Sequence, residues 1–264
     1  MVENHFHSSL PAGKTVKKCI VIGLDGARCD SAFNFKGVEE SAISILSASG
    51  GLYVATAGGD GKLLHTQPTK TAPGWTTLLT GKWANVHHVW YNGIIKLVHP
   101  KTFLTGLVQD GSAKSASFKC IWPWHVQKAY STYRLESIYT KALKLPVKWE
   151  TYPEQNALQA AILAEAADPK GADIIFSIYE RPDEAGHAYG YSNDVPEYVE
   201  SVRLCDKDAY DIIKTIEARE SYNTEDWLII MTSDHGGQDK DHGNLSEDCR
   251  FIFIASNKEI AVHG

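Results

Sequence analysis

Aspartate and histidine side chains are concentrated at three places in this 264-residue chain. They occur as Asp25 behind an apolar run, as Asp183 with His187 four residues later, and as Asp234, His235 and His242 near the end of the chain. Carboxylate oxygen and imidazole nitrogen are ligands that borderline metals such as zinc accept in proteins. If segment 183–187 is helical, its aspartate and histidine share one face and can bind one cation. The spacing indicates a metal site, with polar surface loops as the alternative.

Thr71 is a candidate of a different kind, because it offers a hydroxyl group just before an expected helix. It lies in a short loop between Pro68 and Pro73, just before an apolar, helix-like segment that Gly81 closes. The start of a helix is the positive end of its dipole, where backbone N–H groups can hold an anion such as phosphate. The alternative is that Thr71 only caps the helix, as threonine often does.

These groups need elements that bring them together. Apolar, β-branched runs at 17–24, 172–179 and 227–231 come shortly before each Asp/His group and predict buried strands. In an α/β sheet, ligands bind in the crevice outside the carboxyl ends of the strands. The three groups are therefore expected to meet at one edge of a sheet.

The rest of the chain alternates between segments with the hydrophobic pattern of a strand and segments with that of a helix. We expect further strands at 52–57, 115–121 and 250–255, and helices at 35–49, 153–168 and 196–220. Segment 141–149 reads as an irregular basic stretch, and residues 1–16 as a flexible polar lead-in. This order predicts one α/β domain over 1–264, a three-layer sandwich with a mostly parallel central sheet and helices on both faces.

Composition narrows the classes of function. A net charge of −6 argues against a surface for nucleic-acid polymers or for an anionic membrane. Five scattered cysteines, an odd number without a C-x-x-C pair, favour reduced thiols. With no apolar leader and no apolar run of membrane-spanning length, a cytoplasmic protein acting on a small molecule is expected. The string GLDGAR lacks the G-x-G-x-x-G spacing of a dinucleotide-binding loop.

Four motifs occur together: DGAR at 25–28, TKTAPGWTTLLTG at 69–81, PDEAGH at 182–187, and SDHGG with DHGN at 233–244. In this order they resemble the alkaline phosphatase superfamily, most closely its type I phosphodiesterase/nucleotide pyrophosphatase branch. The resemblance runs from about residue 20 to residue 244. It implies an alkaline phosphatase-like fold.

The resemblance also implies two divalent metal ions, zinc first, with manganese and iron as alternatives. One ion would be bound by Asp25, Asp234 and His235 with the Thr71 oxygen, and the other by Asp183, His187 and His242. The residue matching Thr71 is the family's nucleophile, which becomes phosphorylated and is then freed by water. We expect hydrolysis of phosphate esters, with phosphodiesters or nucleotide pyrophosphates ahead of monoesters.

One position departs from the nucleotide pyrophosphatases, which carry an asparagine three residues after the nucleophile. Here Gly74 stands there, followed by Trp75. We expect Gly74 to open the pocket, Trp75 to offer a ring on which substrate stacks, and Asn92 to replace the missing phosphate contact. Glu180 and Glu184 are candidates for orienting a metal-binding histidine. A phosphomonoesterase and a non-catalytic metal- or phosphate-binding protein remain the alternatives.

Overall fold

The computed structural model describes residues 1–260, which form an α/β fold around one seven-stranded sheet with the order β2-β7-β6-β1-β5-β3-β4. The strands are β1 (Val16–Leu24), β2 (Gly51–Thr56), β3 (Ala116–Cys120), β4 (Val147–Thr151), β5 (Ile174–Tyr179), β6 (Glu225–Ser233) and β7 (Phe251–Ser256). Strand β7 pairs antiparallel with β6 and β2, and all other pairs are parallel. The predicted α/β class and mostly parallel sheet are confirmed.

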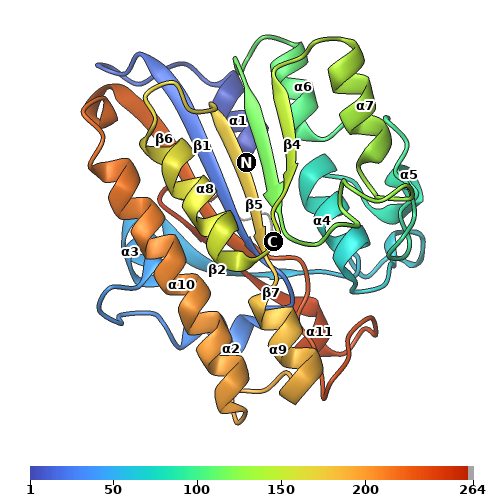
Figure 1. Cartoon of the computed structure of the whole chain (residues 1–264). Helices are drawn as coiled ribbons and strands as arrows, with labels where there is room; N and C mark the ends of the chain where they lie inside the picture. Colours follow the sequence, from blue (N-terminus) through green and yellow to red (C-terminus); the bar gives the residue numbers. More distant parts are fainter. Residues whose placement is uncertain (261–264) are drawn as a thin grey trace.

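Helices connect the strands and pack against the sheet (Figure 1). They are α1 (Val2–His7), α2 (Cys29–Phe33), α3 (Ala42–Ser49), α4 (Thr71–Thr80), α5 (Ala84–His87), α6 (Phe103–Gln109), α7 (Arg134–Ala142), α8 (Gln155–Ala167), α9 (Arg181–Tyr189), α10 (Pro196–Glu217) and α11 (Glu247–Arg250). Within the described part of the chain, no helix is both long and apolar enough to cross a membrane.

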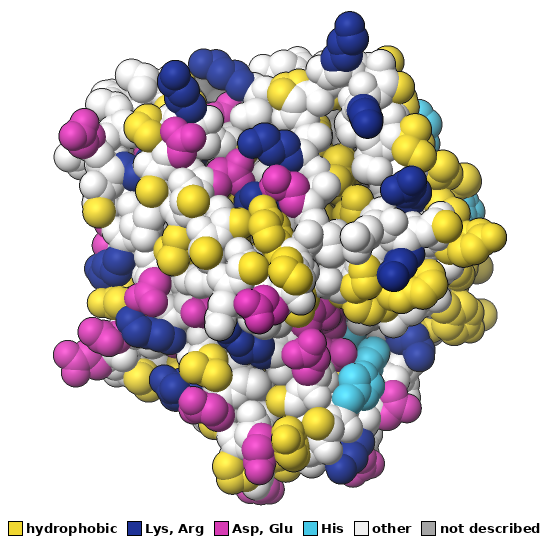
Figure 2. Space-filling model, in the orientation of Figure 1, with side chains coloured by type: hydrophobic (Ala, Val, Ile, Leu, Met, Phe, Trp, Pro, Cys, Tyr) yellow, Lys and Arg dark blue, Asp and Glu magenta, His cyan; other side chains and the backbone are white. Residues whose placement is uncertain are grey.

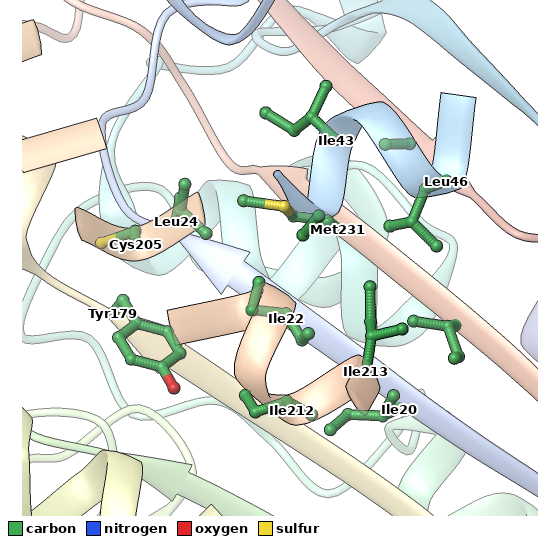
Figure 3. Packing of buried hydrophobic residues seen from close by; sticks show 14 of the residues in the cluster. Ile20, Ile22, Leu24, Ile43, Leu46, Tyr179, Cys205, Ile212, Ile213 and Met231 are labelled. Atoms are coloured by element: carbon green, nitrogen blue, oxygen red, sulfur yellow. The ribbon is translucent and has the colours of Figure 1, made fainter. Parts of the chain in front are cut away.

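Strand β1 is the centre of two hydrophobic clusters, because successive strand residues point to opposite faces. Ile20, Ile22 and Leu24 pack into the cluster that α3, α8 and α10 cover, and Figure 3 shows them against Ile43, Ile212 and Met231 among others. Cys19 and Val21 pack into the second cluster, which includes residues of α4 and α6. Each fully buried Ile or Leu side chain contributes about 1.5–3 kcal/mol. This burial holds the carboxyl end of β1 in place.

The register of the three central strands places three acids side by side. Leu24 pairs with Tyr179 of β5 and with Ser233 of β6. The next residue of each strand is an acid, namely Asp25, Glu180 and Asp234. The apolar runs in the sequence predict strands at these places, and the parallel register of the strands makes the three acids neighbours.

Three segments differ from the expectations. Residues 2–7 form α1 rather than a flexible lead-in, because Val2 and Phe6, four residues apart, are buried in the second cluster. The helix expected at 35–49 begins only at Ala42, since Gly37 and Glu40 have positive φ and Ser41 caps α3. Segment 141–149 contains the end of α7 and the start of the edge strand β4. Strand β4 is only partly buried, and its apolar residues alternate with charged ones. No continuous apolar run therefore marks this strand in the sequence.

Candidate metal centre and active site

The first metal-ligand group lies at the ends of β1 and β6. Nε2 of His235 is 3.4 Å from Oδ1 of Asp25 and 3.4 Å from Oδ2 of Asp234. One ligand atom of each residue lies within 4.8 Å of the others, and all three side chains are buried. The structure therefore brings together the three residues predicted for the first ion.

The second group comes from α9 and the loop after β6. Asp183 and His187 are one helical turn apart, with Oδ2 of Asp183 3.5 Å from Nε2 of His187. Oδ1 of Asp183 is 3.6 Å from Nε2 of His242. The rings of His235 and His242 stack with centroids 3.9 Å apart, so the two groups adjoin. One ligand atom each of Asp183, His235 and His242 also lies within 4.8 Å of the others.

The three histidines share one orientation that suits metal binding. Nδ1 of each ring contacts a backbone carbonyl oxygen: that of Gly236 for His235, of Thr69 for His242 and of Lys240 for His187, at 2.8, 2.9 and 2.9 Å. A carbonyl oxygen only accepts hydrogen bonds, so Nδ1 must carry the proton. This fixes the tautomer in which Nε2 presents a lone pair toward the carboxylates.

The buried carboxylates of the first group favour binding of a cation. Burial, together with nearby carboxylates, raises the pKa of both Asp25 and Asp234 well above the usual range. Burial lowers the pKa of His235 well below its usual value. Oδ2 of Asp234 and Nε2 of His235 are buried without a hydrogen-bond partner in the described residues. A divalent ion would satisfy both atoms and favour the ionised carboxylates, so these residues fit the expected metal.

Thr71 lies next to this group as the first residue of α4. Its Oγ1 donates to Oδ1 of Asp25 at 3.4 Å. Lys70, not Thr71, is the N-cap residue, and no side chain caps the helix. The Thr71 hydroxyl is therefore directed at the metal-ligand group, in contrast to the capping role considered as the alternative.

Asn92 lies close to Thr71. Its Oδ1 accepts a hydrogen bond from the backbone N–H of Ala72 at 2.9 Å. Asn92 and Thr71 line one cleft, whose volume is about 770 Å³, together with Trp122, Glu184 and others. Nδ2 of Asn92 makes no hydrogen bond to the described residues and is free to donate.

The expectation for Trp75 is wrong. The indole is fully buried in the second hydrophobic cluster, so no substrate can stack on it. Instead, its Nε1–H donates to Oδ2 of Asp25 at 2.8 Å. Trp75 follows Thr71 by one helical turn, which puts both side chains on the face of α4 that meets Asp25.

Gly74 does not open the pocket. A Cβ atom at this position would lie 2.8 Å from the backbone oxygen of Asp234 and 2.9 Å from its Cβ. Glycine therefore allows α4 to approach the end of β6 closely. An asparagine, as nucleotide pyrophosphatases carry there, would require these two elements to separate.

Tyr191 is a site residue that the sequence did not reveal. Its hydroxyl donates to Oδ1 of Asp183 at 2.5 Å. Gly186 and Gly237 make room for the ring, because a Cβ on either would lie 2.2–2.3 Å from it. Since Tyr191 follows α9 in an irregular segment, no periodic pattern marks it.

The surface around the cleft combines acidic, histidine and apolar side chains. Figure 2 shows one place where histidine side chains lie next to acidic ones, with hydrophobic side chains close by. His187 is among the exposed residues of this cleft, whereas His235 is fully buried. The second group therefore borders solvent, and the first lies deeper.

Comparison with known proteins assigns the chain to a family. The family model for type I phosphodiesterase/nucleotide pyrophosphatase matches residues 19–249. The chain belongs to this family. No protein with a curated description matches the sequence.

Solved structures share the fold. Murine ectonucleotide pyrophosphatase/phosphodiesterase 5 is 19% identical with a TM-score of 0.53, over 83% of this chain and 57% of its own. The phosphonate monoester hydrolase of Agrobacterium radiobacter is 13% identical with a TM-score of 0.58, over 91% and 68%. A sulfatase-like protein from Bacteroides thetaiotaomicron is 11% identical with a TM-score of 0.64, over 93% and 65%. The chain thus spans little more than half the length of the murine protein.

Proposed function

We propose that this protein is a two-metal hydrolase of phosphate esters, acting on phosphodiester or nucleotide pyrophosphate bonds through a phosphothreonine at Thr71. The scaffold would be the three-layer sandwich of the alkaline phosphatase-like fold. One observation carries the proposal: the Thr71 hydroxyl lies beside two adjoining carboxylate–imidazole groups whose histidine Nε2 atoms are oriented for a metal.

The residues divide into two ligand sets. Asp25, Asp234 and His235 would bind one ion together with Thr71, and Asp183, His187 and His242 the other. Three protein ligands of mixed oxygen and nitrogen type suit zinc best, with manganese or iron as alternatives. When bound, two such ions would lower the pKa of the attacking hydroxyl and stabilise the entering and leaving oxygens of an in-line displacement.

The protein's own groups would orient the reaction. Thr71 Oγ1 would attack phosphorus, and its proton would end on the leaving oxygen, which departs as an alcohol or a phosphate. The phosphoryl group on Thr71 keeps the other ester group of the substrate, and water then releases it as a phosphate monoester and restores the threonine hydroxyl. Asn92 can donate from Nδ2 to a phosphate oxygen, since its Oδ1 is already held by the Ala72 amide. Because α4 begins at Thr71, the positive end of its dipole also faces the phosphate.

A small-molecule substrate, rather than a nucleic-acid polymer, fits a cleft of about 770 Å³ in a protein of net charge −6. The murine relative has been solved as an inactive threonine-to-alanine variant in complex with AMP. This supports a threonine-dependent site for a nucleotide phosphate here. A cytoplasmic location agrees with the five unpaired cysteines.

The decisive experiment compares hydrolysis of bis-p-nitrophenyl phosphate and p-nitrophenyl phosphate by zinc-loaded wild type and Thr71→Ala. Thr80→Ala, at the other end of α4, is the matched control for loss of a threonine hydroxyl. We expect preferential diester turnover in wild type and control, and a loss of at least about 10³-fold in Thr71→Ala. Acid-quenched wild type should carry on Thr71, by peptide mass spectrometry, a p-nitrophenyl phosphoryl group when the diester is the substrate and a bare phosphoryl group when the monoester is.

The outcomes separate the alternatives. Preference for the monoester, with the same loss in Thr71→Ala, would make the protein a phosphomonoesterase. Metal binding without turnover of either substrate would favour the non-catalytic binding protein. Undiminished turnover in Thr71→Ala would rule out the phosphothreonine route.

A further inference from the structure

Strand β4 forms one edge of the sheet, next to α7 (Figure 1). It pairs with β3 on one side, and no described strand pairs with its other side. An edge strand presents unpaired N–H and C=O groups to which another chain can bind, so proteins usually shield such edges. The proposed function uses neither β4 nor α7.

The free backbone groups of this edge belong to three residues of β4. At its two ends, β4 bonds to β3 through the carbonyl oxygen of Pro146 and the N–H of Tyr152. In a parallel ladder every second residue of a strand bonds to the same neighbour, so the even-numbered residues of β4 face β3. The backbone groups of Val147, Trp149 and Thr151 therefore face away from the sheet. Among the described residues, none hydrogen-bonds to the N–H of Trp149 or Thr151.

A groove of about 610 Å³ lies between β4 and α7. Three cationic residues line it, namely Arg134 and Lys141 of α7 and Lys144 just after this helix. All three are exposed, and no described acidic residue lines the groove with them. The only acidic residue of α7, Glu136, is fully buried in an ion pair with Lys96. The charges of the three cations are therefore not offset within the groove.

The backbone holds these cations on the groove side. Arg134 and Lys141 are two helical turns apart and share one face of α7. Lys144 has a φ of 54°, a conformation that glycine or asparagine would adopt more readily. A lysine at this turn thus keeps a cation beside the edge strand. Figure 2 shows Lys and Arg side chains among hydrophobic ones where Figure 1 places α7.

We propose that the free edge of β4 and this groove bind an extended acidic peptide segment of a partner protein, which adds one strand to the sheet. Backbone hydrogen bonds to Trp149 and Thr151 would align the segment. Alternate side chains of an added strand point to the same face, so acidic residues at every second position would meet the three cations. No described residue lines both this groove and the catalytic cleft, so the proposal is independent of the proposed function.

Other occupants fit this surface less well. Pairing of β4 with β4 of a second copy would bring two sets of cations together, and like charges opposite each other are destabilising. An anionic membrane or a nucleic acid would offset the cations but would leave the N–H groups of Trp149 and Thr151 without strand pairing. The open strand edge therefore favours a peptide.

The test measures binding of three fluorescein-labelled peptides to full-length protein by fluorescence anisotropy at low salt. The first alternates glutamate with valine over eight residues. The second replaces glutamate by lysine, and the third replaces valine by proline, which keeps the charge but removes every second N–H group. We expect saturable binding of the first peptide below about 1 mM, and binding at least about tenfold weaker for the other two.

Protein variants locate the binding surface. The double variant Lys141→Glu with Lys144→Glu should bind the first peptide about tenfold more weakly, because two attractive contacts become repulsive. Lys36→Glu with Lys170→Glu is the matched control, since both lysines are exposed and lie outside the groove. These substitutions are at exposed positions, and urea denaturation would verify that the fold persists. By NMR, the amide hydrogens of Trp149 and Thr151 should exchange more slowly when the first peptide is bound.

Several outcomes would overturn the proposal. These are the absence of saturable binding of the first peptide, equal binding of the proline peptide, and equal losses in the groove variant and its control. Unchanged exchange at Trp149 and Thr151 would exclude addition of a strand. Binding to vesicles of phosphatidylserine and phosphatidylcholine, lost in the groove variant and without peptide binding, would make the groove a membrane contact. Thr71→Ala should bind the first peptide as wild type does, so failure of the proposed function would leave this result unaffected.

Discussion

The buried indole of Trp75 donates its only N–H to Oδ2 of Asp25, 2.8 Å away. Asp25 also accepts from Thr71 through its other oxygen. The indole thus fixes the carboxylate that lies next to the proposed nucleophile. Gly23 of β1 makes this contact possible, because a Cβ there would lie 2.4 Å from the Trp75 ring.

We predict that Trp75→Phe weakens the first metal site while the fold persists. A residue that orients a metal ligand changes metal affinity or activity by about 10–100-fold when it is removed. Zinc affinity by competition with a chromophoric chelator, and phosphodiester turnover at saturating zinc, would measure this. Trp149→Phe is the control, since Trp149 donates to Thr140 in α7 and loses the same atoms away from the site.

If Trp75→Phe and Trp149→Phe show equal zinc affinities, the indole–carboxylate hydrogen bond has no functional role. Loss of stability alone, with unaltered affinity, would point to packing as the sole contribution of Trp75.

A second prediction concerns the close approach of α4 to β6 at Gly74. In Gly74→Ala the new methyl group meets backbone and Cβ atoms of Asp234, which cannot move aside independently. Overpacking of this kind costs about 1–3 kcal/mol of unfolding free energy. We also expect slower hydrolysis, because Thr71 moves with α4. Urea denaturation and turnover number are the measurements.

Gly106→Ala supplies the opposite control. Gly106 lies inside α6, where a Cβ would have no described atom within 4 Å apart from its chain neighbours and the backbone of its own helix. Alanine should therefore stabilise the protein by up to about 1 kcal/mol through helix propensity. If both glycine variants were stabilised, the steric reading of Gly74 would be refuted.

The third prediction is a pH dependence of stability from His87. This ring is fully buried and contacts Oγ1 of Thr77. Burial lowers its pKa from 6.5 to about 4. Between these values the unfolded chain binds a proton and the folded chain does not, so stability is complete above pH 6.5 and falls as the pH drops toward 4.

One such proton contributes a slope of about 1.4 kcal/mol per pH unit. His87→Gln keeps a polar partner for Thr77 and removes the proton, so its unfolding free energy should fall less steeply with acid. Urea denaturation from pH 7 to pH 5, with zinc present for both proteins, would measure the difference in slope. Parallel slopes would contradict a depressed pKa at His87.

Much of the candidate site could be predicted from the sequence, because strand ends and short motifs are local features of the chain. Asp25 and Asp234 follow β-branched runs, and Asp183 and His187 have helical spacing. The structure places these residues together with His242 and Thr71. Their metal binding and the phosphothreonine step remain predictions that the experiments above address.

By itself, then, the sequence determined the α/β class, the strands that end in acids and the motif-bearing residues, since each depends on residues close in the chain. Tertiary structure decided which distant side chains meet. Trp75 was expected to face substrate and instead holds Asp25, Tyr191 reaches Asp183, and His125 meets Glu180. These contacts depend on strand register and on the space that glycines leave. The hydrophobic periodicity of the sequence indicates neither of them.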